Sequence, residues 1–465
     1  MNIPKIGLLP MYLKLYDNIK NDKNSSNNRI EDFYNTIVCE FEKRNVEVIT
    51  TPVCMLEGEF AMAIEKFEQY QVDAVVTLHL AYSPSLESIK ALTGTKLPIV
   101  ILDTTPTYEF GPSQNAEEIA YNHGIHGVQD MCNMLIRNGK IFQIKAGHWK
   151  ESDVIDRLLG CLRAAIVANN MMNSRVGRIG SSFKGMGDFS VPREIMCSSI
   201  GIKIVQCTTE KIQSLLPNEE DEKVQLEIRK DMQMFTMEGV NPEVHIRTIR
   251  TCLAVREWIE NEKLTAFTFN FLDIDKTSGL LTVPFMEASK AMARGLGYAG
   301  EGDVLTAALV GALVSVYPQT TFTEMFCPDW ENDSILLSHM GEMNIGISSD
   351  KPVLKEFKLR YTDVENPMIA YARLREGKVV LVNLAPGPDN TFSLIVASGM
   401  MQDVACEDNM TGKIRGWFKP SMAISDFLEA YSKLGGTHHE ALVYGDVLNE
   451  IVQFGKLMGW RVVEI

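Results

Sequence analysis

The sequence predicts an α/β fold, with two doubly wound parallel-sheet domains followed by a mainly antiparallel β domain. Short, almost continuously apolar runs alternate with amphipathic stretches of helical periodicity in the first two thirds of the chain, as in parallel sheets covered by helices. Past about Thr320 apolar and polar residues alternate between turn residues, as in antiparallel strands. Because 465 residues exceed one ordinary core, we expect domains at residues 1–173, 174–320 and 321–465.

The first domain is predicted from four buried strands with helices between them. The strands are expected at residues 5–10, 46–52, 73–80 and 97–106. Between them, "IEDFYNTIVCEFEKRN" and "EFAMAIEKFEQYQ" have the spacing of amphipathic helices.

The second domain is predicted to start near Arg175, where "RVGRIGSSF" begins a new strand and helix series. The long "EVHIRTIRTCLAVREWIENEK" is helical, residues 264–274 form a strand, and "PFMEASKAMARGLGYAG" forms a helix. In the third domain, "MIAYARLREGKVVLVNLAPG" and "TFSLIVASGMMQDV" indicate antiparallel strands, with one late helix at "AISDFLEAYSKLGG".

Charge and composition exclude several classes of partner. The formal net charge is −15 and no Lys/Arg-rich run is present, which argues against nucleic acid. The longest apolar run, Val304–Tyr317, is too short to span a bilayer, and the N-terminus has no cleavage site of a signal peptide, so no membrane partner is expected. The nine cysteines are scattered without a C-x-x-C pair, which indicates buried thiols in a reducing, cytoplasmic compartment.

Acidic residues in apolar surroundings are the first candidates for chemistry. Glu301 and Asp303 in "YAGEGDVLTAAL" lie where a loop meets a helix, and the alternative is an acidic pair favoured by the helix dipole. Glu324 lies among Thr, Phe and Cys, where an unpaired carboxylate is costly unless it binds a partner or a metal. The alternative for Glu324 is an exposed loop acid near Trp330.

Histidines complete this candidate set. His339 follows the strand-like "SILLSH", and His438 and His439 stand side by side in "GGTHHEALVYGD". Two glutamates with two or more histidines are ligands that Mn²⁺, Co²⁺ or Mg²⁺ accepts, and the absence of cysteine argues against structural zinc. Because neighbouring side chains of a strand point to opposite faces, we expect only one of His438 and His439 to face the metal squarely.

Two glycine-containing segments are further candidates. In "NHGIHGVQDM", glycines on both sides let His126 project from a turn into a cleft, and the alternative is a capping or surface histidine. The segment "GRIGSSFKGMGDF" is glycine-rich after a strand, but it lacks both G-x-G-x-x-G and the P-loop pattern, so it is a weak signal for nucleotide binding.

These segments, in this order, resemble the L-arabinose isomerase family within the wider L-arabinose/L-fucose isomerase group. The clearest match is "LTAFTFNFLDI…GLGYAGEGDVLTAAL", which is similar to the family's strand ending in Asn-Phe and its A-G-E-G-D segment. "FTEMF" resembles its F-x-E element, "LLSHMGEMN" its S-H-M-x-E element and "GGTHHEALVYG" its G-G-x-H-H element. "GIHGVQDM" resembles the A-H-G segment, and "RVGRIGSSFKGMGDF" the strand that enters the second domain.

The resemblance implies a metal-dependent aldose–ketose isomerase of a small free sugar. It implies Mn²⁺, with Co²⁺ or Mg²⁺ as alternatives, bound by four residues: Glu301, Glu324, His339 and His439. Glu301 and Glu324 would also be the catalytic acid/base pair, and the substrate would contact His126, Phe271 and His438. Homo-oligomers, as trimers or hexamers, are expected, with His126 facing the substrate of a neighbouring subunit.

The residues fit this chemistry independently. Isomerisation moves a hydrogen between C1 and C2, and a metal on the carbonyl and hydroxyl oxygens acidifies the neighbouring C–H and O–H. One carboxylate then acts as base and a second as acid. An enediol and a hydride shift both remain open, and no nicotinamide or flavin fingerprint is present.

The first strand departs from the family pattern. The family follows this strand with a sugar-contacting Gln-x-Leu-Tyr-Gly segment, whereas this chain has "GLLPMYLKLYD". We therefore expect an L-arabinose-like pentose or a related hexose or deoxy sugar as substrate. The alternative function is a non-catalytic, cytoplasmic sugar-binding or regulatory relative of these isomerases.

Overall fold

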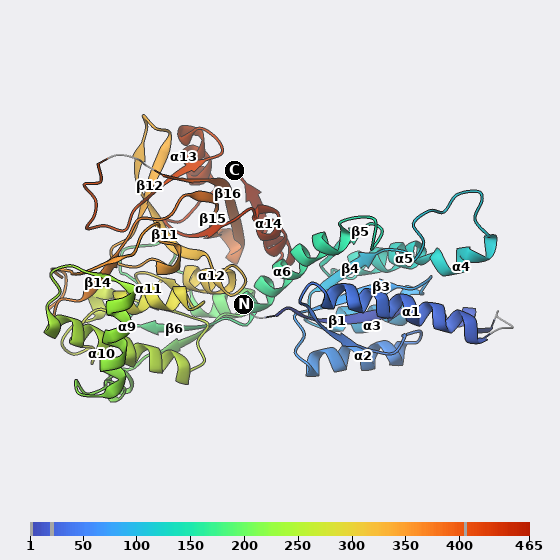
Figure 1. Cartoon of the computed structure of the whole chain (residues 1–465), viewed down its shortest axis with the longest axis horizontal. Coiled ribbons are helices and arrows are strands. Elements are labelled where there is room, and N and C mark those ends of the chain that lie inside the picture. Colours follow the sequence, from blue (N-terminus) through green and yellow to red (C-terminus); the bar gives the residue numbers. More distant parts are fainter. Residues whose placement is uncertain (1–2, 19–22, 404–406) are drawn as a thin grey trace. The chain divides into compact units, whose positions relative to one another are not determined.

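A computed structural model describes residues 3–18, 23–403 and 407–465. The chain divides into two compact units, Met1–Asn169 with Lys456–Gly459 (unit 1) and Asn170–Gly455 with Trp460–Ile465 (unit 2) (Figure 1). Unit 2 contains both the second parallel sheet and the antiparallel sheet, so the predicted fold class is confirmed. The division of the chain into three domains stays a prediction.

Unit 1 is built on a five-stranded parallel sheet of order β2-β1-β3-β4-β5. The first four strands fall inside the predicted apolar runs, and the fifth follows the next helix. The strands are β1 (Lys5–Met11), β2 (Glu47–Thr50), β3 (Ala74–His79), β4 (Ile99–Asp103) and β5 (Phe142–Ala146).

Helices cover both faces of this sheet, which is why its central strands are apolar on both sides (Figure 1). On one face, α1 (Lys23–Glu42) and α6 (Val154–Met172) pack their apolar stripes against β1, β3 and β4. On the other face lie α2 (Glu57–Gln69), α3 (Ser85–Gly94) and α5 (Gly124–Arg137).

The parallel sheet of unit 2 has the order β10-β9-β6-β7. Its strands are β6 (Arg175–Ile179), β7 (Lys203–Gln206), β9 (Ala266–Phe269) and β10 (Gly297–Ala299). Its principal helices are α9 (Glu222–Met234), α10 (Pro242–Asn261), α11 (Phe285–Ala293) and α12 (Val304–Val314).

Two predicted boundaries in this sheet were wrong. The predicted strand at residues 264–274 ends at Phe269, because Asn270 caps a 3₁₀ turn, η4 (Phe271–Asp273). The predicted helix "PFMEASKAMARGLGYAG" ends at Ala293, and its last residues form β10. Gly295, with φ +88°, provides the left-handed residue that stops α11.

The C-terminal part of unit 2 is a seven-stranded sheet of order β15-β18-β11-β12-β17-β16-β19. Because β15 also pairs with β16, six strands close into an antiparallel barrel, and β19 joins β16 from outside in parallel. The strands are β11 (Thr320–Asp329), β12 (Ser334–Ser338), β15 (Gly377–Pro386), β16 (Phe392–Gln402), β17 (Gly416–Pro420), β18 (His439–Tyr444) and β19 (Arg461–Glu464).

Two late helices are present, not the single helix that was predicted: α13 (Ile424–Lys433) lies between β17 and β18, and α14 (Leu448–Leu457) follows β18. The smaller elements are α4 (Ile119–Asn122), α7 (Arg193–Ile195), α8 (Thr209–Ser214), β8 (Thr236–Met237), β13 (Val353–Glu356) and β14 (Met368–Tyr371). In the part of the chain that the structure describes, no helix combines the length and the hydropathy that crossing a membrane requires.

The described cysteines are free thiols, but the prediction that they are buried was only partly correct. Three are buried, namely Cys54, Cys161 and Cys252. Three others, Cys39, Cys197 and Cys327, are exposed. Cys406 lies outside the described residues.

A buried ion-pair network joins α9, α10 and α11. The Lys290 ammonium group, 4% exposed, contacts Asp231 and lies 2.9 Å from Glu227 Oε1. The Arg256 guanidinium group bridges Glu227 and Glu287 at 2.9 and 2.8 Å. Each buried charge in the network therefore contacts an opposite charge. Without such a partner, burial of a charged group would be strongly unfavourable.

Lys290→Met should lower the free energy of unfolding by about 3 kcal/mol, because it leaves Asp231 and Glu227 buried without their ammonium partner. Urea unfolding measures this change. The matched control is Lys433→Met, which breaks an exposed pair with Glu429 and should leave stability almost unchanged. Equal losses in the two variants would contradict a structural role for the network.

Candidate active site

Strand register brings the first two candidate residues together. In the antiparallel pairing of β11 with β18, Glu324 lies directly opposite His439. On the other side of β11, Glu324 lies opposite Ser338, the last residue of β12, and His339 follows immediately. Directly opposed residues of antiparallel strands share one face, so this register places the imidazole of His439 beside Glu324. His339 reaches Glu324 from just beyond the end of β12.

Glu301 reaches the same place from a tight turn between β10 and α12. Its φ is +62°, a left-handed conformation that is uncommon for a residue with a side chain. Gly302 follows with φ +77°, and a Cβ at this position would lie 2.2 Å from Ser181 O. Asp303 then caps α12 by accepting the Thr306 N–H at 2.9 Å, so the helix-terminus interpretation is correct for Asp303.

The five predicted residues form one cluster in unit 2. His439 Nε2 lies 2.9 Å from Glu324 Oε1 and 3.6 Å from Glu301 Oε2. His339 Nε2 lies 3.2 Å from Glu324 Oε1, and His438 Nε2 lies 3.8 Å from Glu301 Oε2. His439 is fully buried, while the side chain of His438 is 40% exposed and forms the rim.

Both adjacent histidines face the cluster, so the expectation from strand alternation was wrong. Alternation applies within a strand, but β18 begins at His439 and His438 precedes it. The two ring centroids are 4.4 Å apart. His438 lies at the rim of the cluster, where Asp188 holds its Nδ1 side.

Each imidazole is oriented by a carboxylate on its Nδ1 side. His439 Nδ1 lies 2.9 Å from Asp303 Oδ2, and His438 Nδ1 lies 2.7 Å from Asp188 Oδ2. The third pair joins His339 Nδ1 to Glu342 Oε2 at 2.6 Å. A carboxylate on one ring nitrogen fixes the tautomer and directs the other nitrogen, here Nε2, toward Glu301 and Glu324.

The electrostatics of the cluster favour positive charge at its centre. Burial by itself raises the pKa of Glu301, but the nearby imidazoles of His438 and His439 lower it to about 2. The pKa of Glu324 also lies below its ordinary value, because the His339 and His439 contacts outweigh its burial. Burial lowers the pKa of His339, but Glu342 and Glu324 raise it to about 10.

The donor set fits a divalent metal ion. One ligand atom from each of Glu301, Glu324, His438 and His439 lies within 4.8 Å of all the others. Glu301 Oε2 and His439 Nε2 are buried without a hydrogen-bond partner among the described residues, although they lie 3.6 Å apart. Carboxylate oxygens with imidazole nitrogens are ligands that Mn²⁺ or Co²⁺ accepts.

The other two predicted substrate contacts lie outside this cluster. Phe271 is buried in η4, where its ring packs against Phe183 at 5.9 Å and Tyr361 at 5.7 Å. His126 belongs to unit 1, where it is exposed on the first turn of α5 and lies 4.7 Å from the ring of His123. The side chain of His123 makes no capping hydrogen bond at the start of α5.

Sequence reasoning missed the residues that support the cluster. The ring of Phe189 stacks on His439 at 4.7 Å with an interplanar angle of 7°, and Asp188 precedes it. Both end the glycine-rich segment that had suggested only weak nucleotide binding. Phe322 packs edge-on against His339 and His439, and its place two residues before Glu324, on the same face of a strand, was the available signal.

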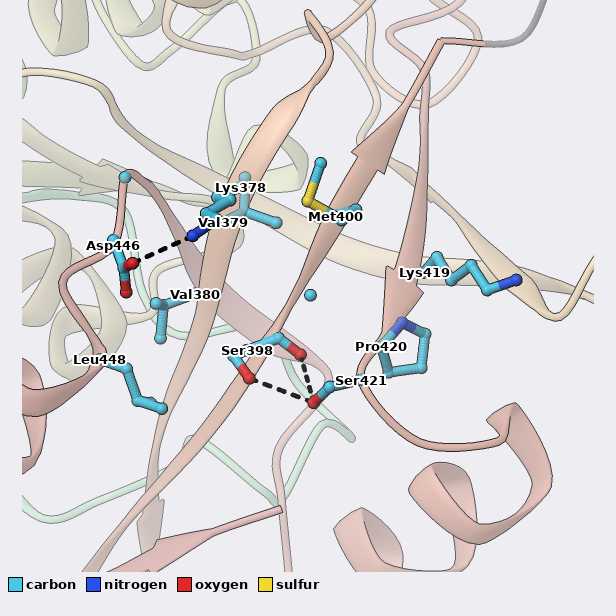
Figure 2. Close-up of a pocket in the computed structure, with 12 residues that line it drawn as sticks. Lys378, Val379, Val380, Ser398, Met400, Lys419, Pro420, Ser421, Asp446 and Leu448 are labelled. Atoms are coloured by element: carbon cyan, nitrogen blue, oxygen red, sulfur yellow. Dashed lines mark hydrogen bonds and ion pairs between the residues drawn. The ribbon is translucent and has the colours of Figure 1, made fainter.

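A separate pocket of about 440 Å³ lies on the outside of the barrel, and none of the cluster residues lines it. Figure 2 shows Lys378 reaching Asp446 at 3.1 Å across one side and the hydroxyls of Ser398 and Ser421 facing each other at 3.1 Å. Lys378 and Asp446 on its rim are exposed and paired with each other, so the buried cluster remains the better candidate for chemistry.

Comparisons with known proteins identify the family of the chain. The family model for the L-arabinose isomerase C-terminal domain matches residues 319–461, and the model for the central domain matches residues 198–317. L-Arabinose isomerase of Geobacillus kaustophilus (strain HTA426) is 26% identical over 439 residues, which are 90% of this chain and 85% of that protein. L-Arabinose isomerase of Anoxybacillus flavithermus (strain DSM 21510 / WK1) is 26% identical over 463 residues, 94% and 90% of the two chains.

One solved structure also aligns with this chain, namely a periplasmic solute-binding protein from Actinobacillus succinogenes 130z with bound D-allose. The alignment has 12% sequence identity and covers 67% of this chain and 91% of that protein. Its TM-score of 0.18 is too low to support an inference. The two family models together span more than half of the chain and define its class, the aldose–ketose isomerases. The chain belongs to the L-arabinose isomerase family.

Gly300→Ala, in the turn that carries Glu301, should displace the imidazole ring of His339. A Cβ at this position would lie 2.9 Å from His339 Cε1 and 3.1 Å from Nε2, so the ring must move away from Glu324. We expect a loss of about 1–3 kcal/mol in the free energy of unfolding, as for other overpacked sites. Gly412→Ala is the control, because its Cβ meets nothing within 4 Å. A wild-type stability for Gly300→Ala would show that the ring adapts freely.

Proposed function

We propose that the protein is a metal-dependent aldose–ketose isomerase of a small free sugar. The observation that carries this proposal is the convergence of two ionised, largely buried carboxylates with imidazoles whose Nε2 atoms face them. The substrate is an L-arabinose-like pentose or a related hexose or deoxy sugar, because the segment after β1 lacks the family's sugar-contacting glutamine.

The proposed metal ligands are Glu301, Glu324, His339 and His439, with Mn²⁺ as the ion and Co²⁺ or Mg²⁺ as alternatives. The deep burial of His339 and His439 supports their choice over His438 at the rim. When bound, the ion polarises the sugar's carbonyl and acidifies the neighbouring C–H and O–H. The carboxylates on Nδ1 hold each imidazole in a fixed orientation, so that Nε2 would bind the ion in exchange for its proton.

Glu301 and Glu324 are the proposed acid/base pair. Their low pKa values leave both carboxylates ionised and able to accept a proton at neutral pH. One takes the proton from the carbon that loses hydrogen, and the other takes the proton of the neighbouring hydroxyl group. The two protons are then delivered to the other carbon and to the former carbonyl oxygen, which leaves both carboxylates ionised again. The left-handed turn at Glu301 and the strand position of Glu324 bring the two carboxylates in from different elements.

The remaining contacts define the proposed sugar-binding wall. His438, held by Asp188 at the rim, can donate from Nε2 to a sugar hydroxyl. Phe271 supplies an apolar wall, and His126 contacts the sugar from a neighbouring copy in a trimer or hexamer. A cytoplasmic location also stays a prediction.

Glu301→Gln and Glu324→Gln should each reduce kcat by about 10²–10⁴-fold, because each removes one of the two proton-transfer groups. The measurement uses protein stripped of metal, supplied with Mn²⁺ and tested on a panel of pentoses, hexoses and deoxy sugars. In D₂O, proton transfer by glutamate should place solvent deuterium in the product. Turnover without deuterium would favour a hydride shift, and no turnover of any sugar with any divalent ion would favour the non-catalytic alternative.

His439→Ala should abolish Mn²⁺ binding, whereas His438→Ala should retain the ion and mainly lower turnover. The reason is that His439 is fully buried against both glutamates, while His438 lies at the rim. Calorimetric titration with Mn²⁺ measures the first effect and steady-state kinetics the second. Equal loss of Mn²⁺ in both variants would place His438 among the ligands.

A further inference from the structure

Glu342 is buried beside the cluster and accepts three hydrogen bonds. Its Oε2 accepts from His339 Nδ1 at 2.6 Å and from the Gly341 N–H at 2.8 Å. Its Oε1 accepts from the Tyr298 hydroxyl at 2.5 Å. Both oxygens are therefore held, so the carboxylate cannot rotate without breaking a buried hydrogen bond, which is costly.

Tyr298 lies in β10, three residues before Glu301, and it is completely buried. Its ring packs against Phe267 at 5.2 Å, Phe269 at 5.3 Å and edge-on against Phe322 at 5.8 Å. Burial, and next the Glu342 carboxylate, raise the pKa of Tyr298 well above its ordinary value. The hydroxyl therefore keeps its proton and remains a donor.

We propose that Tyr298 is a positioning residue, whose hydroxyl fixes Glu342 and thereby holds His339 with Nε2 directed at Glu324. This inference rests on the proposed function, because it concerns how tightly the cluster binds its metal ion. Nothing in the chain of contacts requires Tyr298 to touch the sugar. Its hydroxyl sets the orientation of one imidazole through one carboxylate.

The two contributions of Tyr298 can be separated by one substitution. Tyr298→Phe keeps the ring, and with it the packing against Phe322, but removes the donor to Glu342 Oε1. Glu342 then has a free oxygen and can turn, so His339 loses its fixed orientation. Partners of this kind typically contribute 10–100-fold to metal affinity, and we expect about a tenfold weaker affinity for Mn²⁺.

The experiment measures free Mn²⁺ by electron paramagnetic resonance during titration of the metal-free full-length protein. Tyr298→Phe should raise the dissociation constant about tenfold and shift the Mn²⁺ concentration for half-maximal activity equally, with kcat recovered at saturating Mn²⁺. The matched control is Tyr444→Phe, which also removes a tyrosine hydroxyl, here one that donates to the Arg375 carbonyl at 2.7 Å. This variant should bind Mn²⁺ with wild-type affinity.

A double-mutant cycle tests whether Tyr298 acts through Glu342. Glu342→Ala alone should weaken Mn²⁺ binding, and adding Tyr298→Phe should weaken it no further, because the acceptor of the Tyr298 hydroxyl is already removed. Wild-type affinity in Tyr298→Phe, or additive losses in the double variant, would overturn the inference. Failure of the wild-type protein itself to take up Mn²⁺ would instead contradict the proposed function. Urea unfolding of the metal-free proteins checks that each variant is folded.

Discussion

The antiparallel register between β11 and β18 is the constraint on which the site depends. It places Glu324 opposite His439 on one face of the barrel, while Glu440 points to the other face and is hydrogen-bonded by Tyr431. A slip of one residue would exchange these faces and bury Glu324 among the barrel's apolar side chains. Closure of the barrel by β15 and β16 makes such a slip incompatible with the remaining pairings.

Charge balance is the second condition of this arrangement. Two carboxylates that meet in a buried place repel each other unless cationic or hydrogen-bonding groups surround them. Here the imidazoles surround them, and a further carboxylate orients each imidazole. Carboxylates and imidazoles therefore alternate in the cluster. The outer carboxylates, Asp188, Asp303 and Glu342, come from separate segments of the chain.

The sequence was sufficient for the parts that depend on local patterns. Apolar runs predicted four of the five strands of unit 1, and two glutamates in apolar context marked the cluster. Short elements escaped prediction: β10 has only three residues, too few for a periodicity, and was absorbed into a helix. Both histidines face the cluster because β18 begins at His439 and leaves His438 outside the strand. Hydropathy does not locate the start of a strand to a single residue.

Long-range contacts were also beyond sequence reasoning. Asp188 and His438 are in contact although 250 residues separate them in the sequence. Nothing in the glycine-rich segment that contains Asp188 indicated this partner. Similarly, the Tyr298 hydroxyl is satisfied by Glu342 only because β10 lies beside the segment after β12. The resemblance to a family pointed to the five residues of the cluster but assigned no role to Asp188, Phe189 and Phe322, which contact them.

The order of the site residues along the chain has a consequence for biosynthesis. The Glu301 turn belongs to the parallel sheet of unit 2, whose strands all precede the barrel in the sequence, whereas His438 and His439 follow nearly all of the barrel strands. On the ribosome, the sheet can form while its acidic turn still lacks the imidazoles that balance it. The cluster is therefore complete only after His439 has been synthesised and β18 has paired with β11.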